Sequence, residues 1–254
     1  MFNYIRNKYH PIFWLFQFSL FRSLYKLKFS HFIKRKKFGN FFLYLPRHLT
    51  HFLNINNFEK ETFDFVQTLN IERKLENTSF VDIGGNIGLY SLYFKKNYNS
   101  KIYIFEPDED NFILLFKTKK INEFNNFIIF PLALSNKQEI KKFLKDDISG
   151  SVGTLSLKKN VPQIRMGLNK ETDVYCDKLD SFMNVIKKVS WIKIDIEGYE
   201  VEALEGMMEL IKRDQPNLII ESNEINIIKI SEMISPFNYK IKKIDTDPNY
   251  VFYK

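Results

Sequence analysis

The sequence predicts an α/β protein built on a doubly wound, mostly parallel sheet. Short apolar runs rich in β-forming residues alternate with longer amphipathic stretches along most of the chain. Several of these runs end in acidic residues, and one is followed by a glycine turn that leads into a helical pattern. With 254 residues the chain is long enough to bury one large core. Strands that alternate with helices are typical of a parallel sheet covered on both faces.

The predicted elements follow in a simple order. Residues 1–37 are expected to form a basic helical extension, and residues 38–254 a single domain that begins with a strand or hairpin at 38–54 and a helix at 58–75. Core strands are expected at 80–83, 101–105, 127–131, 191–195 and 217–221. Helices are expected at 89–96, 109–122, 201–213 and 225–234. Two closing strands, 239–244 and 250–253, suit an antiparallel edge pair.

Between residues 135 and 174 the alternation breaks. Lys, Asp, Gly and Ser dominate residues 145–154, and short β-like pieces flank them. We expect an inserted β-hairpin region that shapes the substrate entrance, because binding residues concentrate on such loops. The alternative is a surface excursion without a role in binding.

The segment after the first core strand predicts a ligand site. It reads D-x-G-x-N-x-G, with Asp82, Gly84, Gly85, Asn86 and Gly88 as candidate cofactor-binding residues. A strand, a glycine turn and a helix in this order hold nucleotide-like ligands at the carboxyl edge of a sheet. In neither register does the segment supply the glycines of the dinucleotide fingerprint G-x-G-x-x-G. A purely structural strand-to-helix turn is the alternative.

Glu106 follows the second core strand directly, about 20 residues after the glycine turn. An acid at this place can accept hydrogen bonds from two ribose hydroxyls. Pro107 ends the strand, and Asp108 can cap the next helix. The alternative for Glu106 is a solvated acid at a strand end.

Asp195 and Glu197 are the candidate catalytic residues. Asp195 ends the predicted strand 191–195 and Glu197 lies two positions later, so in an extended segment both side chains point the same way. One can orient an acceptor and the other can accept its proton, or the pair can hold Mg²⁺. The alternatives are a hydrogen bond from Asp195 to cofactor or loop amides, and a helix cap by Glu197. Lys193, within the same buried strand, needs an acid partner such as Glu221, or a path to solvent.

In combination, these segments resemble the FkbM family of methyltransferases that use S-adenosylmethionine (SAM). The family pattern runs roughly DxGANxG, FEP, ALS, LD and KxDxEGxE, followed by an acid after a further strand. The matching segments here are 81–88, 104–107, 132–135, 179–180, 191–198 and Glu221. Gly85 stands where alanine is usual, and the resemblance spans about residues 38–221.

The resemblance implies a Rossmann-like class I methyltransferase sheet and SAM as the cofactor, with Ala133 of the ALS segment among its contacts. It implies methyl transfer to a hydroxyl oxygen, and we expect a sugar hydroxyl in bacterial surface-glycan biosynthesis of the capsule or lipopolysaccharide type. A divalent metal such as Mg²⁺ is left open but not predicted. The alternatives are a non-catalytic module of the same fold that docks to a membrane or a partner, an O-methyltransferase of a secondary metabolite and, most distantly, an NAD-dependent enzyme.

The net charge of +8 is unevenly distributed. Residues 1–50 contain ten Lys or Arg and no acid, whereas residues 51–254 contain 28 basic and 30 acidic residues. The apolar run 11–21 is too short to span a bilayer and lacks a signal-peptide cleavage site. Residues 1–37 can therefore lie on the inner face of an anionic membrane or form a cap packed on the domain. Nucleic-acid binding is not expected, because most of the chain carries net negative charge.

Cysteine and histidine usage narrows the remaining classes. The single cysteine, Cys176, excludes an intramolecular disulfide and a cysteine-based metal site, and it favours a cytoplasmic location. We expect Cys176 to be a small apolar core residue. All four histidines lie within the first 51 residues without ligand spacing, so no metal site is predicted. The sequence does not indicate an oligomeric state.

Overall fold

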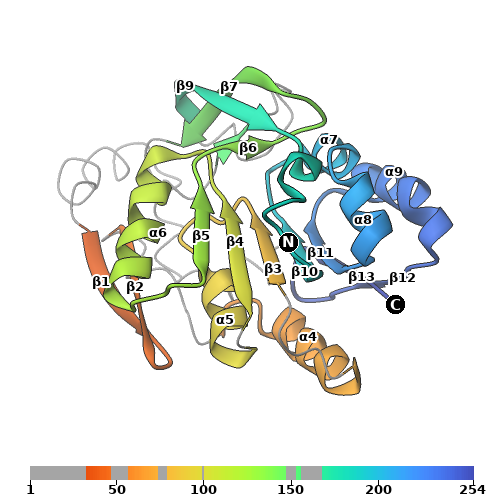
Figure 1. Cartoon of the computed structure of the whole chain (residues 1–254), viewed down its shortest axis with the longest axis horizontal. Helices are drawn as coiled ribbons and strands as arrows, with labels where there is room; N and C mark the ends of the chain where they lie inside the picture. Colours follow the sequence, from red (N-terminus) through yellow and green to blue (C-terminus); the bar gives the residue numbers. More distant parts are fainter. Residues whose placement is uncertain (1–32, 47–56, 74–78, 99, 147–152, 156–167) are drawn as a thin grey trace.

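The computed structural model describes residues 33–46, 57–73, 79–98, 100–146, 153–155 and 168–254. Its centre is a seven-stranded sheet in the order β12-β13-β11-β10-β3-β4-β5 (Figure 1). Five neighbouring strands are parallel: β3 (Ser79–Ile83), β4 (Lys101–Phe105), β5 (Phe127–Phe130), β10 (Val189–Ile194) and β11 (Asn217–Glu221). The strand order reverses between β3 and β10. The predicted doubly wound α/β sheet is confirmed.

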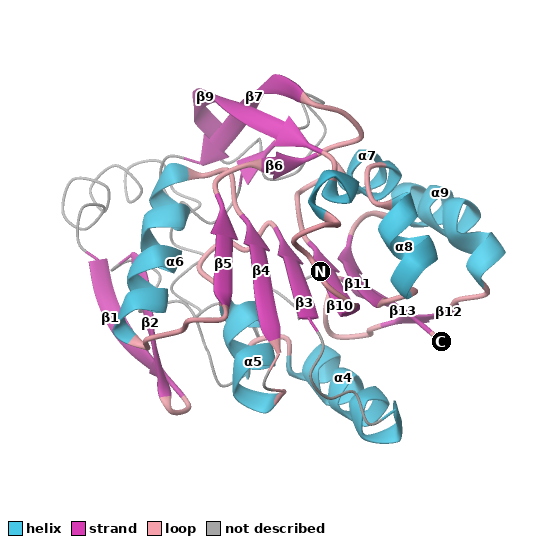
Figure 2. Ribbon diagram, in the orientation of Figure 1, coloured by secondary structure: helices cyan, strands magenta, loops and turns pink. Residues whose placement is uncertain are grey.

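Helices cover both faces of this sheet (Figure 2). One face packs against α4 (Lys60–Arg73), α5 (Leu89–Asn97), α6 (Glu109–Ile121) and a hairpin of β1 (Ile33–Phe38) and β2 (Phe41–Pro46). The other face packs against η4 (Leu179–Phe182), α7 (Glu200–Glu205), α8 (Met208–Asp214) and α9 (Glu224–Ile234). Alternation along the strands feeds both cores, because Phe80 enters the first and its neighbour Val81 the second.

The C-terminal end completes the sheet. After α9 and the short η5 (Ser235–Phe237), β12 (Lys240–Lys243) forms the edge. The last strand, β13 (Asn249–Tyr253), lies antiparallel between β11 and β12. The predicted antiparallel closing pair is confirmed. Its inner strand is the buried one, since Val251 and Phe252 enter the two cores while all four residues of β12 are exposed.

A second sheet lies above the carboxyl ends of the central strands (Figure 1). Its order is β6-β9-β7-β8, formed by β6 (Ala133–Leu134), β7 (Glu139–Asp146), β8 (Gly153–Thr154) and β9 (Leu168–Asp177). The long antiparallel pair of β7 and β9 confirms the inserted hairpin, although the insert runs from 133 to 177 rather than from 135 to 174. Cys176 is buried in its small core, as expected, and burial raises the pKa of its thiol to about 11.

The helix predicted at 201–213 is two helices, α7 and α8. The break occurs at Gly206, where an added Cβ would lie 2.0 Å from the carbonyl oxygen of Ser135. The backbone at Ser135, where the chain enters the insert, therefore lies against Gly206 and leaves no room for a side chain there. The Asp180 carboxylate accepts two backbone amides of the first turn of α8, at 3.1 and 2.9 Å, and so caps the second helix.

The front of the chain also departs from the prediction. Residues 33–37 belong to strand β1, so the boundary at 37/38 falls inside a hairpin and these residues are not helical. The hairpin forms because Leu43 and Leu45 of β2 are fully buried in the first core and β1 pairs along their strand. The rest of the predicted extension, residues 1–32, lies outside the described residues. Within the part of the chain that the structure describes, no helix is long and apolar enough to cross a bilayer.

Candidate functional site

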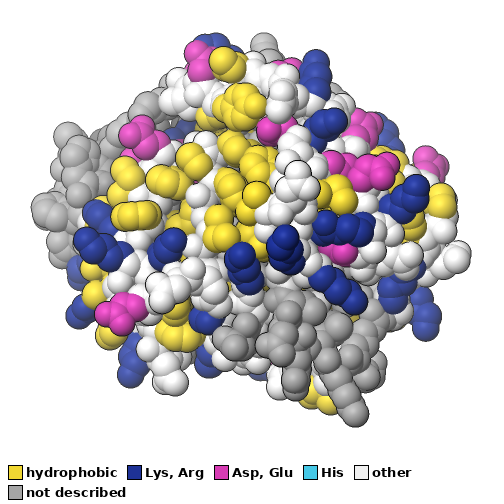
Figure 3. Space-filling view, in the orientation of Figure 1, with side chains coloured by type: hydrophobic (Ala, Val, Ile, Leu, Met, Phe, Trp, Pro, Cys, Tyr) yellow, Lys and Arg dark blue, Asp and Glu magenta, His cyan; other side chains and the backbone are white. Residues whose placement is uncertain are grey.

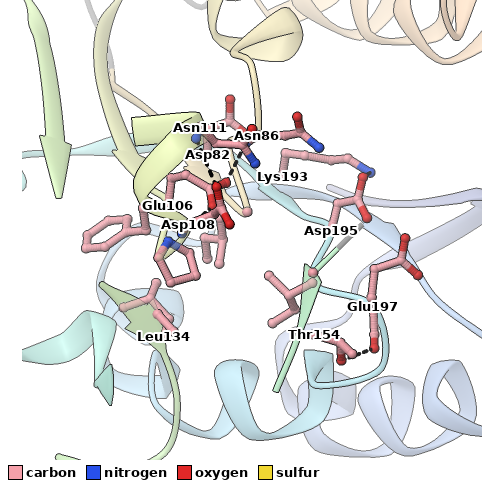
Figure 4. Close-up of a pocket in the computed structure, with 18 of the residues that line it drawn as sticks. Asp82, Asn86, Glu106, Asp108, Asn111, Leu134, Thr154, Lys193, Asp195 and Glu197 are labelled. Atoms are coloured by element: carbon pink, nitrogen blue, oxygen red, sulfur yellow. Dashed lines mark hydrogen bonds and ion pairs between the residues drawn. The ribbon is translucent and has the colours of Figure 1, made fainter. Parts of the chain in front are cut away.

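A pocket opens at the carboxyl ends of β3, β4 and β10, where the strand order reverses. Doubly wound sheets bind their ligands at such switch points. Figure 4 shows acidic side chains from three strand ends around this space, with the insert residue Thr154 facing them. Of the predicted site residues, the following line the pocket: Asp82, Gly84, Gly85, Asn86, Glu106, Ala133, Asp195 and Glu197.

The glycine turn is held between its neighbouring strands. Gly84 has φ of 76°, and a Cβ there would lie 2.0 Å from the carbonyl oxygen of Asp195. A Cβ on Gly85 would lie 2.2 Å from Cγ2 of Ile104. Both amides donate to the carbonyl oxygen of Phe105, at 2.9 and 3.2 Å. At Gly84 a side chain would meet backbone, so only glycine fits; at Gly85 an added Cβ would require the Ile104 side chain to shift. The backbone itself therefore forms this wall of the pocket.

Gly88 is the one predicted cofactor residue that the structure does not bring to the pocket lining. It precedes α5 with φ of 88°, and its amide donates to the carbonyl oxygen of Gly85 at 2.8 Å. An added Cβ would lie 2.8 Å from a methyl group of Leu115. Its position closes the turn and starts the helix, which is a structural role.

Glu106 lies at the end of β4 with only 4% of its surface exposed. Its two carboxylate oxygens accept the amides of Asn86 at 2.6 Å and Asp108 at 2.8 Å (Figure 4). Burial raises the pKa of Glu106 to about 8, although the two amides favour the charged form. The alternative of a solvated strand-end acid is therefore excluded, and the side chain joins the glycine turn to the start of α6.

Asp82 is the second buried carboxylate of the site, with 2% exposure. It accepts a hydrogen bond of 2.5 Å from the hydroxyl of Ser91 in α5. Burial raises the pKa of Asp82 to about 6, while Ser91 and the ammonium of Lys193 act in the opposite direction. The site therefore contains two carboxyl groups, Asp82 and Glu106, whose pKa values lie near neutral pH.

Lys193 is buried beneath the pocket and finds the partners that its position requires. Its Nζ donates to Oδ1 of Asn249 at 2.8 Å and lies 3.8 Å from Oδ2 of Asp195 and 3.9 Å from Oε2 of Glu221. Its ammonium also lies 5.0 Å from the ring centre of Tyr90. The predicted acid partner is confirmed. Asp195 remains 28% exposed at its side chain, so its charge is balanced from below while its carboxylate is open to a ligand.

Glu197 reaches the pocket by a different route from the predicted one. Its φ of 53° is left-handed, so the segment is not extended there and the expected alternation with Asp195 does not apply. The hydroxyl of Thr154 donates to the Glu197 carbonyl oxygen at 2.7 Å (Figure 4). The amide of Gly198 is bound by Glu200, the first residue of α7. Among the described residues, no group of three His, Cys, Asp or Glu side chains is gathered for a metal.

The insert is tied to the rest of the pocket by Lys145 as well. Lys145 is 8% exposed, and its Nζ contacts the Asp108 carboxylate at 2.7 Å and also bonds Asp110. Burial alone would lower the pKa of Lys145, but the hydrogen bonds to both carboxylates outweigh it and raise the pKa. Strand β7 is thereby joined to the start of α6, beside Glu106.

Several lining residues were not found from the sequence. They are Phe58, Tyr90, Asn111, Lys145 and Thr154. Tyr90 and Asn111 lie in the first turns of the helices that follow the glycine turn and Glu106, and this placement was a usable signal. Phe58, Lys145 and Thr154 come from segments with no local pattern that marks them, and only the fold brings them to the pocket.

Comparison with protein families identifies the family to which this chain belongs. The model of the methyltransferase FkbM domain matches residues 82–239, more than half of the chain. The chain belongs to the FkbM methyltransferase family. The matched range includes the glycine turn, Glu106, the insert and the Asp195–Glu197 segment. The family is one of methyltransferases, and the fold prediction drawn from the resemblance is confirmed.

Individual relatives are distant. The chain is 26% identical over 187 residues to methyltransferase sdnD of Sordaria araneosa, covering 58% of this chain and 67% of that protein. It is 24% identical over 148 residues to methyltransferase 1 of Beauveria bassiana (strain ARSEF 2860), covering 52% of this chain and 59% of that protein. The crystal structure of an FkbM methyltransferase from Methylobacillus flagellatus KT superposes with a TM-score of 0.51 at 18% identity. That match covers 70% of this chain and 44% of the crystallised chain, and it shows the shared fold.

Proposed function

We propose that this FkbM-family protein is a SAM-dependent O-methyltransferase that acts on a sugar hydroxyl of a surface-glycan precursor. The observation that carries the proposal is the buried Glu106 carboxylate, bound to the amide of Asn86 in the glycine turn at 2.6 Å. An acid placed against this turn is suited to a ribose in the adjoining pocket. This arrangement and the family membership support SAM as the methyl donor.

The residues present fit SAM. Each oxygen of Glu106 receives one backbone amide, so both retain acceptor capacity for the two ribose hydroxyls. Ala133, Leu134 and Pro107 add small or apolar surface on the same side of the pocket, which suits a flat aromatic base. When bound, SAM supplies a methyl group on a sulfonium sulfur, and the leaving group is the neutral thioether S-adenosylhomocysteine.

The opposite side of the pocket supports an acceptor role. Methyl transfer requires that the acceptor oxygen be held in line with the methyl carbon, so positioning contributes most of the rate. The half-open Asp195 carboxylate would accept the proton of the acceptor hydroxyl, as a general base. The Lys193 ammonium lies 3.8 Å from that carboxylate on its buried side, and Glu197, which also lines the pocket, would orient the acceptor.

The lining supports a sugar as the acceptor. Phe58 and Tyr90 supply aromatic surface in the pocket that Asp195 and Glu197 also line. A sugar ring presents apolar C–H faces that pack on aromatic rings and hydroxyls that bond to carboxylates. The surface-glycan context and a cytoplasmic site of action rest on the family resemblance and on the basic front of the chain.

Calorimetry with SAM, S-adenosylhomocysteine and NAD is the first test. We expect micromolar affinity for SAM and no measurable affinity for NAD. Glu106→Ala should weaken SAM about ten- to a hundred-fold, because charge-assisted hydrogen bonds to the ribose are lost. Unchanged SAM affinity in a folded variant would remove Glu106 from the site.

Transfer itself is tested with methyl-labelled SAM and a polysaccharide fraction of the source cells, with and without EDTA. We expect label in the polysaccharide, and deletion of the gene should remove an O-methyl group from the surface glycan. Label in a low-molecular-weight product instead would favour the secondary-metabolite alternative. SAM binding without transfer to any cell fraction would favour a non-catalytic module.

A further inference from the structure

The outward stripe of α6 mixes large apolar side chains with lysines. Its exposed residues after the first turn recur at helical spacing: Ile113, Phe116, Lys117, Lys120 and Ile121. Phe116 is 54% exposed and Ile113 is 40% exposed. The solvent side of this helix therefore places large apolar side chains and lysines next to one another.

Strand β1 extends the same composition beside α6. Its exposed side chains are Ile33, Lys34, Arg35 and Lys37. The β1–β2 hairpin is fixed to the helix, because the Phe42 amide donates to Oδ1 of Asn122 at 2.7 Å and the Asn122 amide group donates back to the Phe42 carbonyl oxygen at 2.7 Å. A third bond of 3.0 Å joins the amide of Tyr44 to the hydroxyl of Thr118. The two elements therefore present one rigid flank.

Acidic side chains are few on this flank. Glu109 and Asp110 lie in the first turn of α6, and Asp110 is engaged by Lys145 of the insert. Glu123 follows the helix and is exposed. Figure 3 shows Lys and Arg side chains interspersed with hydrophobic ones over α6 and along the left side of the molecule. The flank of β1 and α6 is thus both cationic and apolar.

We infer that this flank, formed by the exposed side chains of β1 and α6, is a docking surface for an anionic lipid membrane. Cations attract lipid headgroups of opposite charge, while exposed Ile and Phe side chains enter the boundary between headgroups and acyl chains. A nucleic-acid surface would use the cations alone and would gain little from Ile33, Ile113 and Ile121. The membrane is therefore the partner that uses both features of the flank.

The flank lies next to the pocket, so docking would bring the pocket close to the membrane. This inference does not depend on the reaction proposed for the pocket. Helix α6 begins at the pocket, where Asp108 and Asn111 are lining residues, and its exposed stripe runs away from that point toward β1. Docking through the stripe would place the pocket beside the bilayer. An acceptor carried on a lipid would then reach the site from the membrane surface.

The test is sedimentation of the full chain with vesicles of phosphatidylcholine alone and with 30 mol% phosphatidylglycerol, at about 20 mM and 500 mM salt. We expect binding to the anionic vesicles at low salt only. Lys117→Gln/Lys120→Gln should lower the partition coefficient about thirty-fold, from the loss of two charges near the surface. Ile113→Ser/Phe116→Ser should lower it at least ten-fold.

Matched controls lie at the opposite edge of the sheet, on α9 and β12, where exposed apolar side chains and lysines also occur but Lys243 is paired with Glu224 at 3.3 Å. Lys229→Gln/Lys240→Gln removes the same charge, and Ile225→Ser/Ile228→Ser removes apolar side chains that are 69% and 60% exposed. Both should bind vesicles like the wild type. All variants should keep the circular dichroism spectrum of the wild type, which reports on the fold, and its SAM affinity, which reports on the proposed function. The inference is overturned if the wild type does not bind anionic vesicles, or if it binds duplex RNA but not vesicles. It is also overturned if the flank variants bind like the wild type, or if flank and control variants lose binding equally.

Discussion

Glu106→Gln tests the electrostatics of the site with almost no change of shape. The carboxylate of Glu106 accepts one amide on each oxygen, from Asn86 at 2.6 Å and Asp108 at 2.8 Å. Glutamine replaces one oxygen with an NH₂ group, which donates hydrogen bonds as the hydroxyl of a protonated carboxyl group does. The variant therefore imitates the protonated side chain and cannot ionise. Any difference in pH dependence between the two proteins isolates the charge of Glu106.

The expected size follows from the pKa. Burial raises the pKa of Glu106 from 4.5 to about 8 in the folded chain. Between pH 4.5 and pH 8 the folded state holds a proton that the unfolded state has released. The free energy of unfolding therefore falls by about 1.4 kcal/mol for each unit by which the pH rises. The contribution is fully present below about pH 4.5 and is lost as pH rises through 8. From pH 5 to 7.5 the wild type should lose about 3 kcal/mol relative to Glu106→Gln.

Urea unfolding of both proteins at pH 5, 6 and 7.5 measures this difference. The wild type should be the more stable at pH 5, and its advantage should shrink steadily as the pH rises. Parallel pH dependences would refute the raised pKa of Glu106 and with it the buried, ligand-ready carboxyl group. Calorimetry adds a check, because hydrogen bonds from ribose hydroxyls favour the charged form. SAM binding near pH 7 should release a proton from the wild type but not from the variant.

Three further changes test other parts of the site. Asp195→Asn should lower methyl transfer at least ten-fold while SAM affinity stays within two-fold, and a near-normal rate of label transfer would make Asp195 structural. Thr154→Val removes the hydroxyl that bonds the Glu197 carbonyl oxygen at 2.7 Å, so it should reduce transfer and lower stability by about 1 kcal/mol, with Thr154→Ser restoring both. If Ser does not restore transfer, the hydroxyl is not what positions Glu197. Gly206→Ala places a Cβ 2.0 Å from the Ser135 carbonyl oxygen and should lower the unfolding free energy by at least about 2 kcal/mol in urea titrations.

The sheet and the ligand end of the site could be predicted because their signals are local. The strands 101–105 and 217–221 have the predicted bounds, since short buried runs with polar or proline ends specify both strand and limits. Glu106 follows its strand immediately, and a parallel sheet brings such residues to one edge whatever the rest of the chain does. The glycine turn is likewise contained within seven consecutive residues.

Contacts between distant segments were decided only by the tertiary structure. The local pattern around Glu197 predicts an extended pair with Asp195, but the observed turn is left-handed and bonded to Thr154, 43 residues earlier in the chain. The pattern at 201–213 predicts one helix, and the close passage of the Ser135 backbone divides it.

By itself, then, the sequence determined the order of strands and helices, the glycine turn and the acids at strand ends, because each depends on residues adjacent in the chain. The tertiary structure decided which insert residues face the pocket and which residue, besides the predicted Glu221, bonds to Lys193. Asn249 reaches Lys193 from 56 residues away, and Lys145 reaches Asp108 from 37 residues away. A buried ammonium group needs hydrogen-bond acceptors as well as a counter-charge, and the local sequence does not identify all of them, because they come from strands and helices far apart in the chain.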